Sequence, residues 1–182
     1  MRTLIAGVGN IFMADDGFGC EVVGRLANRP LPGGVDALDF GIRGIDLGLA
    51  LSSGEYDAAI LIDTAQRGGA PGSLYVIDVP AAVGGADGAP QMEPHAMDPA
   101  RVLQLAASLG WRCPRVQVLA CEPADLGGDD GRMGLSEAVA ASVEPALEEV
   151  MRLLRIDQGM EKEAHGIDTT APAAGAQRLQ EA

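Results

Sequence analysis

The sequence has few basic and few aromatic residues. It contains 13 Lys and Arg against 26 Asp and Glu, which gives a formal net charge of −13 over 182 residues. Because phosphate backbones are bound by clustered basic side chains, a broad nucleic-acid-binding surface is excluded. With one Trp, two Tyr and three Phe, the chain also has too few rings for base-stacking platforms. We therefore expect an aliphatic core and no nucleic-acid partner.

Long apolar runs and paired cysteines are missing as well. No run approaches the roughly 20 residues that a membrane helix requires. The apolar stretch after Met1 is too short for a signal peptide and fits a first strand better. The three cysteines, Cys20, Cys113 and Cys121, are an odd number without CxxC spacing, which favours reduced and buried thiols. We expect a cytoplasmic protein without membrane insertion.

Several common catalytic and cofactor motifs are also missing. The sequence contains no GxxxxGK[ST], no GxSxG and no HExxH. Gly7-Val8-Gly9 could form the turn of a dinucleotide site, with Asp39 near a ribose. However, Phe12 occupies the position of the third glycine, and Asp15 and Asp16 would repel a pyrophosphate. Dinucleotide binding therefore stays a minor alternative.

The hydrophobic pattern predicts a three-layer α/β/α fold around a five-stranded sheet. Expected strands cover residues 3–6, 35–39, 58–62, 73–79 and 116–120. Only about nine residues, rich in Gly and Pro, separate the third strand from the fourth, and a parallel crossover needs a dozen or more. The sheet should therefore be mixed and mostly parallel, with an antiparallel fourth strand. Strands one and three should be neighbours at the switch point.

Helices are expected from residue 16 or 17, over 45–51, over 98–110 and from 136 onward. Pro145 should kink the last helix or start a new segment there. Helical periodicity stops near Ile156. We therefore predict one domain over residues 1–155 and a disordered tail over 156–182.

Three possible ligands follow strand ends or lie in loops: Asp16, Asp63 and His95. Ligand sites of such sheets lie beyond the carboxyl ends of the strands, at the switch point. Two carboxylates and an imidazole there could bind a divalent transition metal and leave positions open for water or substrate. Spacing alone favours a simpler interpretation, in which Asp16 caps the first helix, Asp63 caps a turn and His95 is a solvated loop residue.

The run from Gly7 to Gly19 resembles the opening signature of the hydrogenase maturation proteases. Segments similar to that family follow in order at residues 39–44, 60–64, 71–73, 94–95, 134–136 and 143–147. The resemblance covers residues 1–154. Members of this family are endopeptidases that trim the C-terminal extension of the large subunit of nickel–iron hydrogenases, and their fold is a mixed five-stranded sheet between helices.

The resemblance implies an endopeptidase that acts on the large-subunit precursor after nickel insertion. Asp16, Asp63 and His95 would be its catalytic residues and metal ligands, and the nickel would be supplied by the substrate. Many relatives have Glu where this chain has Asp16, which is one methylene shorter. No tightly bound cofactor of its own is expected.

Substrate positioning is implied for the segment after the second strand. The residues concerned are Asp39, Gly41, Arg43 and Gly44. Glycines there would let a substrate backbone come close, although Asp39 could equally be a turn cap. Two other functions stay open: a non-catalytic nickel-binding maturation factor, and a dinucleotide-dependent oxidoreductase.

Overall fold

A computed structural model describes residues 1–79, 106–110, 113–157 and 159 of the chain. His95, most of the helix expected over 98–110 and most of the predicted tail lie outside these residues. The described elements follow in the order β1 (Thr3–Val8), a 3₁₀ turn η1 (Ala14–Gly17), α1 (Phe18–Leu26), β2 (Val35–Gly41), α2 (Gly44–Ser52), β3 (Ala58–Thr64), β4 (Leu74–Val79), β5 (Arg115–Cys121) and α4 (Glu137–Asp157).

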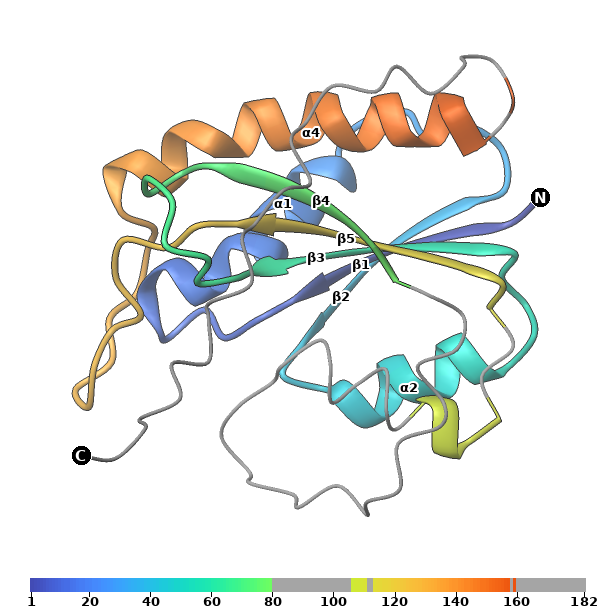
Figure 1. The fold of residues 1–182 in the computed structure, drawn as a ribbon, viewed down its shortest axis with the longest axis horizontal. Coiled ribbons are helices and arrows are strands. Elements are labelled where there is room, and N and C mark those ends of the chain that lie inside the picture. Colours follow the sequence, from blue (N-terminus) through green and yellow to red (C-terminus); the bar gives the residue numbers. More distant parts are fainter. Residues whose placement is uncertain (80–105, 111–112, 158, 160–182) are drawn as a thin grey trace, which may run out of the picture.

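The five strands form one sheet in the order β2-β1-β3-β5-β4 (Figure 1). β1 pairs in parallel with both β2 and β3, and β3 pairs in parallel with β5. β4 alone runs antiparallel, against β5. The mixed sheet, its reversed fourth strand and the neighbouring positions of β1 and β3 are therefore confirmed.

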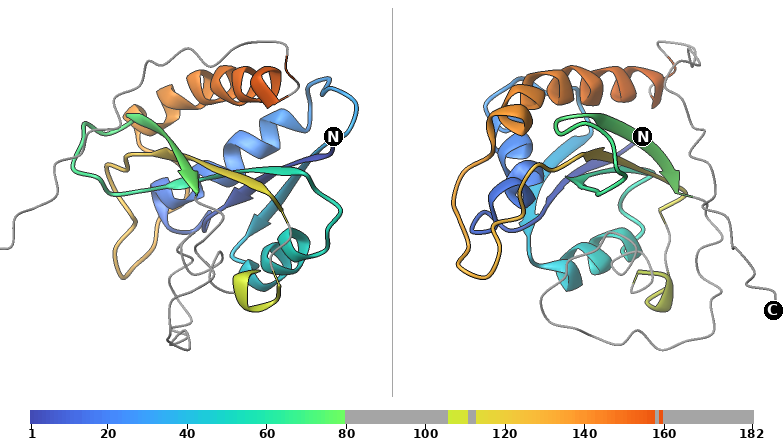
Figure 2. Two further views of the ribbon diagram at one scale, coloured as in Figure 1. Left: turned by 45° about the vertical axis from the view of Figure 1, so that its right-hand side comes forward. Right: turned by 60° about the vertical axis from the view of Figure 1, so that its left-hand side comes forward.

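Helices cover both faces of the sheet. α1 and α4 lie on one face and α2 lies on the other (Figures 1 and 2). β1 separates two apolar clusters, because Leu4, Ala6 and Val8 face the α2 side while Ile5 packs with α1 and α4. Strands buried on both faces read as continuous apolar runs, which explains why β1 and β3 show no alternating pattern.

α4 continues through Pro145 without a break. Of the two outcomes predicted for Pro145, a kink or a new segment, the new segment is therefore excluded. Proline in a helix interior costs about 3 kcal/mol. Val143, Leu147 and Val150 are fully buried on either side of it, and burial of each such side chain contributes about 1.5–3 kcal/mol. Packing of the apolar face thus outweighs the local cost of the proline.

The start of α1 lies directly against the carboxyl ends of β1 and β3. A Cβ atom at Gly19 would come within 2.1 Å of the Ile62 carbonyl oxygen and 2.3 Å of the Val8 carbonyl oxygen. Only glycine allows this approach of helix backbone to strand backbone. The contact places the turn before α1 at the switch point of the sheet.

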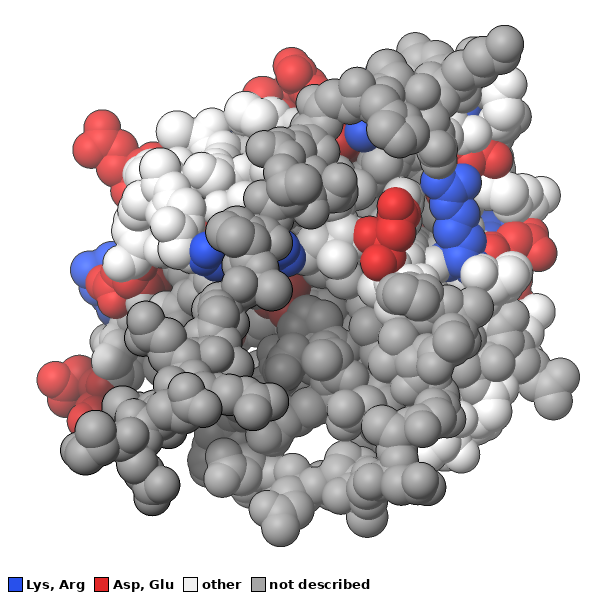
Figure 3. All heavy atoms as spheres, in the orientation of Figure 1, with Lys and Arg blue, Asp and Glu red and all other residues white. Residues whose placement is uncertain are grey.

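Several arginines on the described surface are paired with acidic side chains. Arg2, Arg29 and Arg132 each form an ion pair with an acidic residue. In Figure 3 the basic side chains visible on one face lie beside acidic ones. Within the described residues, no helix is both long and apolar enough to cross a bilayer.

Candidate active site

Asp16 is held at the carboxyl end of β1 by a tight return of the chain. Gly9 has φ +127°, and a Cβ atom there would collide with the Asp16 carbonyl oxygen at 1.8 Å. Asp16 Oδ2 accepts a hydrogen bond from the Asn10 backbone N–H at 2.7 Å. Burial raises the pKa of the Asp16 carboxyl, and its hydrogen bonds offset this only in part. The ionised carboxylate is therefore poorly compensated by the surrounding protein.

Asp63 comes to the same edge from the end of β3. Its side chain is 1% exposed, and its Oδ1 accepts the backbone N–H of Thr64 at 2.7 Å. The Thr64 hydroxyl donates to Asp16 Oδ1 over a long distance of 3.4 Å. Asp16 and Asp63 thus lie at neighbouring strand ends of the β1–β3 switch point, and Thr64 contacts both. Thr64 links the two acids, a role that its position directly after Asp63 could have indicated.

Cys20 lies among the acids of this edge. Its thiol donates to the Gly9 carbonyl oxygen at 3.6 Å. Burial, followed by the hydrogen bond and charge of Asp39 and the charges of Asp16 and Asp63, raises the pKa of Cys20 to about 12. The thiol therefore stays protonated. Cys20, Cys113 and Cys121 are all buried thiols outside any disulfide, as expected for structural thiols.

The segment after β2 carries the predicted substrate-positioning residues. Asp39 is exposed, and Gly41, at φ +53°, accepts a hydrogen bond from the Gly9 N–H at 3.1 Å. Arg43 donates to the carbonyl oxygens of Asp39 and Phe40, so its own loop holds its side chain. Gly44 begins α2. These residues border the same edge of the sheet as Asp16.

Two further acids anchor the surrounding loops. The Glu122 carboxylate, 5% exposed, accepts the backbone N–H groups of Arg67 and Gly68 and the Tyr75 hydroxyl. Asp15, which is fully buried, accepts from the segment between β5 and α4. Sequence reasoning missed both roles, because their partners are far away along the chain.

The described residues contribute two carboxylates to the predicted metal site, and His95 lies outside them. Among the residues that the structure describes, no group of three or more His, Cys, Asp or Glu side chains could by itself hold a metal ion. Asp16 and Asp63 offer oxygen ligands on neighbouring strands. Such a pair suits an ion that brings further ligands with it.

The sequence profile of the hydrogenase maturation proteases matches residues 20–153. This chain belongs to the hydrogenase maturation protease family. Over 94% of its length it is 34% identical to the hydrogenase expression/formation protein HupD of Rhodobacter capsulatus, of which the match covers 76%. It is 31% identical to the hydrogenase 2 maturation protease of Escherichia coli, over 88% of this chain and 94% of that protein.

Solved structures of this protease family share the fold. The hydrogenase maturating endopeptidase HybD from Escherichia coli superposes with a TM-score of 0.68 at 28% identity, covering 86% of this chain and 94% of that one. A hydrogenase 2 maturation peptidase from a Thaumarchaeota archaeon has a TM-score of 0.64 at 31% identity, covering 88% and 100%. The chain is therefore a peptidase, and the interpretation of Gly7–Gly9 as a dinucleotide turn is set aside.

Proposed function

We propose that this protease removes the C-terminal extension from the precursor of a nickel–iron hydrogenase large subunit after nickel insertion. The observation that carries the proposal is the Asp63–Thr64–Asp16 arrangement at the β1–β3 switch point. It provides two carboxylates where a sheet of this kind binds its ligand. Membership of the family indicates the reaction, which is cleavage of a peptide bond. The two acids would select a metal-loaded substrate by binding its metal ion.

In this proposal the nickel ion arrives as part of the substrate. Asp16 and Asp63, with His95 as a third ligand, leave an incomplete coordination shell that a precursor-bound ion would fill with its own ligands. A cation there also compensates the buried charge of the two carboxylates. Nickel held in this way can polarise the scissile carbonyl or activate a water molecule. Metal-free precursor would lack the ion and bind weakly.

Asp39 and the loop that contains Gly41, Arg43 and Gly44 are proposed to guide the substrate chain. Support comes from their position beside Asp16 and from the exposure of Asp39 and Arg43. We place the reaction in the cytoplasm, in residues 1–155 of the chain. The three cysteines, which are buried as thiols, support a reducing compartment.

The decisive experiment compares nickel-loaded with metal-free large-subunit precursor by mass spectrometry after mixing with the protease. Loss of a C-terminal peptide is expected from the nickel-loaded form alone. Asp63→Asn and His95→Ala should abolish the loss. Asp57→Asn is the matched control, because Asp57 is exposed and precedes the opposite end of β3. Trimming by H95A or D63N at the unmodified rate would overturn the site assignment.

Metal content provides an independent readout. If nickel arrives with the substrate, protease purified without added metal should contain far less than one equivalent of any transition metal. Stoichiometric zinc that is lost in D63N would instead identify a resident ion. That result would contradict the substrate-borne role of nickel while leaving Asp63 as a ligand.

A further inference from the structure

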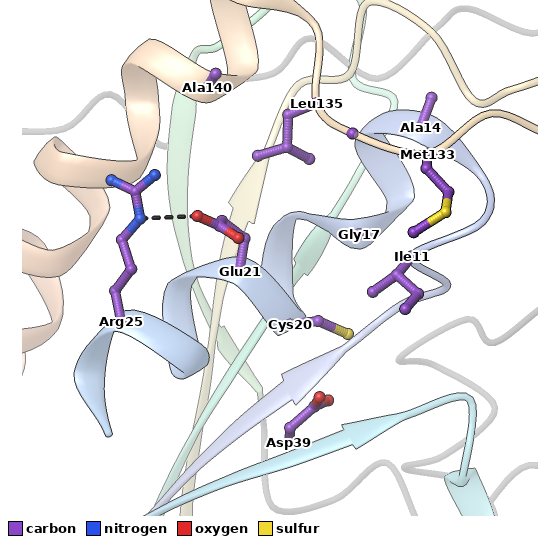
Figure 4. Close-up of a pocket in the computed structure, with 11 residues that line it drawn as sticks. Ile11, Ala14, Gly17, Cys20, Glu21, Arg25, Asp39, Met133, Leu135 and Ala140 are labelled. Carbon is purple, nitrogen blue, oxygen red and sulfur yellow. Dashed lines mark hydrogen bonds and ion pairs between the residues drawn. The ribbon is translucent and has the colours of Figure 1, made fainter. Parts of the chain in front are cut away.

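A groove of about 490 Å³ runs along the exposed side of α1 (Figure 4). Its lining includes Ile11, Gly17, Cys20, Asp39, Met133 and Leu135. Its volume lies in the range of ligand-binding clefts. The metal-ligand roles proposed for Asp16 and Asp63 do not involve this groove.

One wall of the groove is apolar and exposed. Met133 is 67% exposed and Ile11 is 46% exposed. Their side chains lie close together, and Leu135 lines the groove further along, near Glu21 (Figure 4). These side chains come from two segments that are far apart in the sequence. Large apolar side chains gathered at a cleft mark a binding surface more often than single exposed residues do.

The two segments are fixed to each other by the backbone. The Ala14 N–H donates to the Arg132 carbonyl oxygen at 2.6 Å, and the Arg132 N–H donates to the Phe12 carbonyl oxygen at 2.8 Å. Met13 and Arg132 also form an isolated parallel bridge. The apolar wall is therefore already formed in the free protein, which lowers the entropic cost of binding.

The groove is continuous with the candidate active site. Its floor includes Gly17, the residue directly after Asp16, and Cys20, whose thiol is bonded to the Gly9 carbonyl. Asp39, at the carboxyl end of β2, lines the same space (Figure 4). A ligand in the groove would thus reach within one residue of Asp16.

Charge in the groove narrows the choice of ligand. Glu21 and Arg25 neutralise each other in an ion pair of 2.8 Å, which is drawn in Figure 4. Asp39 is left as an exposed acid at the end of the groove near the active site. The remaining lining is mostly apolar, so the ligand should be mainly apolar rather than anionic.

We propose that this groove binds an extended segment of the precursor next to the scissile bond and seats one of its apolar side chains against Ile11, Met133 and Leu135. The proposal rests on the proposed function, since an endopeptidase must hold the chain on at least one side of the bond that it cuts. A groove that begins beside Asp16 and has a preformed apolar wall meets this requirement. The wall then acts as a specificity determinant, apart from the metal ligands.

Photo-crosslinking tests the placement directly. A benzophenone amino acid is introduced at position 133 of the full-length protease, and the nickel-loaded large-subunit precursor is added. The matched control carries the same group at position 49, because Leu49 is also exposed, at 53%, but lies on α2. Crosslinks from position 133 should map to precursor residues within a few positions of the cut. Crosslinks elsewhere, or no more than from position 49, would overturn the proposal.

Kinetics test the energetic contribution. Met133→Asp and Ile11→Asn should each raise KM for the precursor by about tenfold or more with little change in kcat, as expected for loss of one apolar contact. Leu49→Asp should leave both parameters unchanged. All three side chains are exposed, so thermal unfolding should show intact folds. A KM for M133D and I11N equal to that of the unmodified protease would contradict the groove assignment.

The two proposals fail separately in these experiments. If D63N and H95A stop trimming while M133D and I11N have no effect, the groove assignment fails and the metal-site assignment stands. If M133D raises KM while D63N trims normally, the groove assignment stands and the metal-site assignment fails.

Discussion

Asp15 and Ser136 are joined by two hydrogen bonds although 121 positions separate them along the chain. The Ser136 N–H donates to Asp15 Oδ1 at 2.6 Å, and its hydroxyl donates to Oδ2 at 2.9 Å. Oδ2 also accepts the N–H groups of Ala124 and Asp125, each at 2.9 Å. This fully buried carboxylate thus ties the start of α4 and the segment after β5 to the turn that carries Asp16.

Replacing Asp15 should destabilise the fold strongly. Asp15→Asn puts an amide N–H₂ in place of Oδ1, which accepts one N–H, or of Oδ2, which accepts two N–H groups and a hydroxyl. Each buried donor left without a partner costs about 1–3 kcal/mol. We expect a loss of about 3 kcal/mol in the free energy of unfolding, measured by urea titration. A loss below about 0.5 kcal/mol, the usual range for a surface substitution, would show that these hydrogen bonds do not hold the loop.

Asp16→Asn should abolish activity without lowering the stability of the fold. Burial raises the pKa of the Asp16 carboxyl above its ordinary value, so the charged form is less favourable in the fold than in the unfolded chain, which lowers stability above the unfolded pKa. Asp16→Asn removes that charge, and the amide oxygen can still accept from the Asn10 N–H. We expect unfolding stability at pH 7 equal to or above that of the unmodified chain, together with loss of trimming. A D16N variant that unfolds as easily as D15N would contradict this assignment.

The direction of every strand could be predicted from the sequence, because the length of the connection before β4 decides that this strand is antiparallel. The short, Gly- and Pro-rich connection over residues 65–73 leaves no room for a crossover helix, and β4 is antiparallel as a result. The ends of β1 and β3 are neighbours, as the topology predicts, but spacing alone favoured capping roles for Asp16 and Asp63, and the resemblance to the protease family singled them out. At Pro145 the local pattern left a kink and a new segment open, and tertiary packing keeps the helix continuous.

The supporting contacts of the site could not be predicted from the sequence. Asp15 meets partners 109 to 121 positions away, and Glu122 meets Arg67 across 55 positions. No periodicity or motif encodes such pairings. Buried carboxylates are identified as loop anchors only when the positions of the backbone N–H groups are known.

Glu122 predicts an acid-sensitive step in stability. Burial opposes ionisation, but hydrogen bonds from Arg67, Tyr75, Gly69 and Gly68 outweigh it, so the pKa of Glu122 lies below its ordinary value of 4.5. A carboxyl with a lowered folded-state pKa contributes stability that is present above the unfolded pKa and is lost as the pH falls through the folded one. Glu122→Gln should therefore be less stable than the unmodified chain at pH 7. The difference should shrink as the pH falls below about 4.5.

Urea unfolding at a series of pH values from 7 to 3 measures this difference. Glu148→Gln, on an exposed part of α4, controls for the general effect of removing one acid. A stability difference for E122Q that is constant over the whole range would show that ionisation of Glu122 contributes nothing.

The thiols predict low reactivity in the folded protein. Burial chiefly raises the pKa of Cys20 to about 12 and that of Cys113 to about 11, and the thiolate is the reactive form. At pH 8 a disulfide reagent such as DTNB should react slowly with the folded protein. In urea, where the chain is unfolded, it should react readily with all three cysteines. Since these folded pKa values lie above the unfolded value of 9.0, stability should fall as the pH rises beyond 9. Rapid labelling of native protein that is absent in Cys20→Ala would contradict the buried thiol.

Two glycines of α1 offer a matched test of how the helix positions the active site. Alanine at Gly19 would bring a Cβ atom to 2.1 Å from the Ile62 carbonyl oxygen, so α1 must move away from β1 and β3. Such overpacking costs about 1–3 kcal/mol or more, and the movement would displace Asp16. At Gly24, in the same helix, a Cβ atom meets nothing within 4 Å, and alanine should stabilise the helix by about 0.5–1 kcal/mol.

Gly19→Ala should therefore lower both unfolding stability and the trimming rate, whereas Gly24→Ala should raise stability and leave trimming unchanged. Equal effects of the two substitutions, in urea unfolding and in mass-spectrometric trimming assays, would show that the close contact of α1 with the strand ends does not set the geometry of the site.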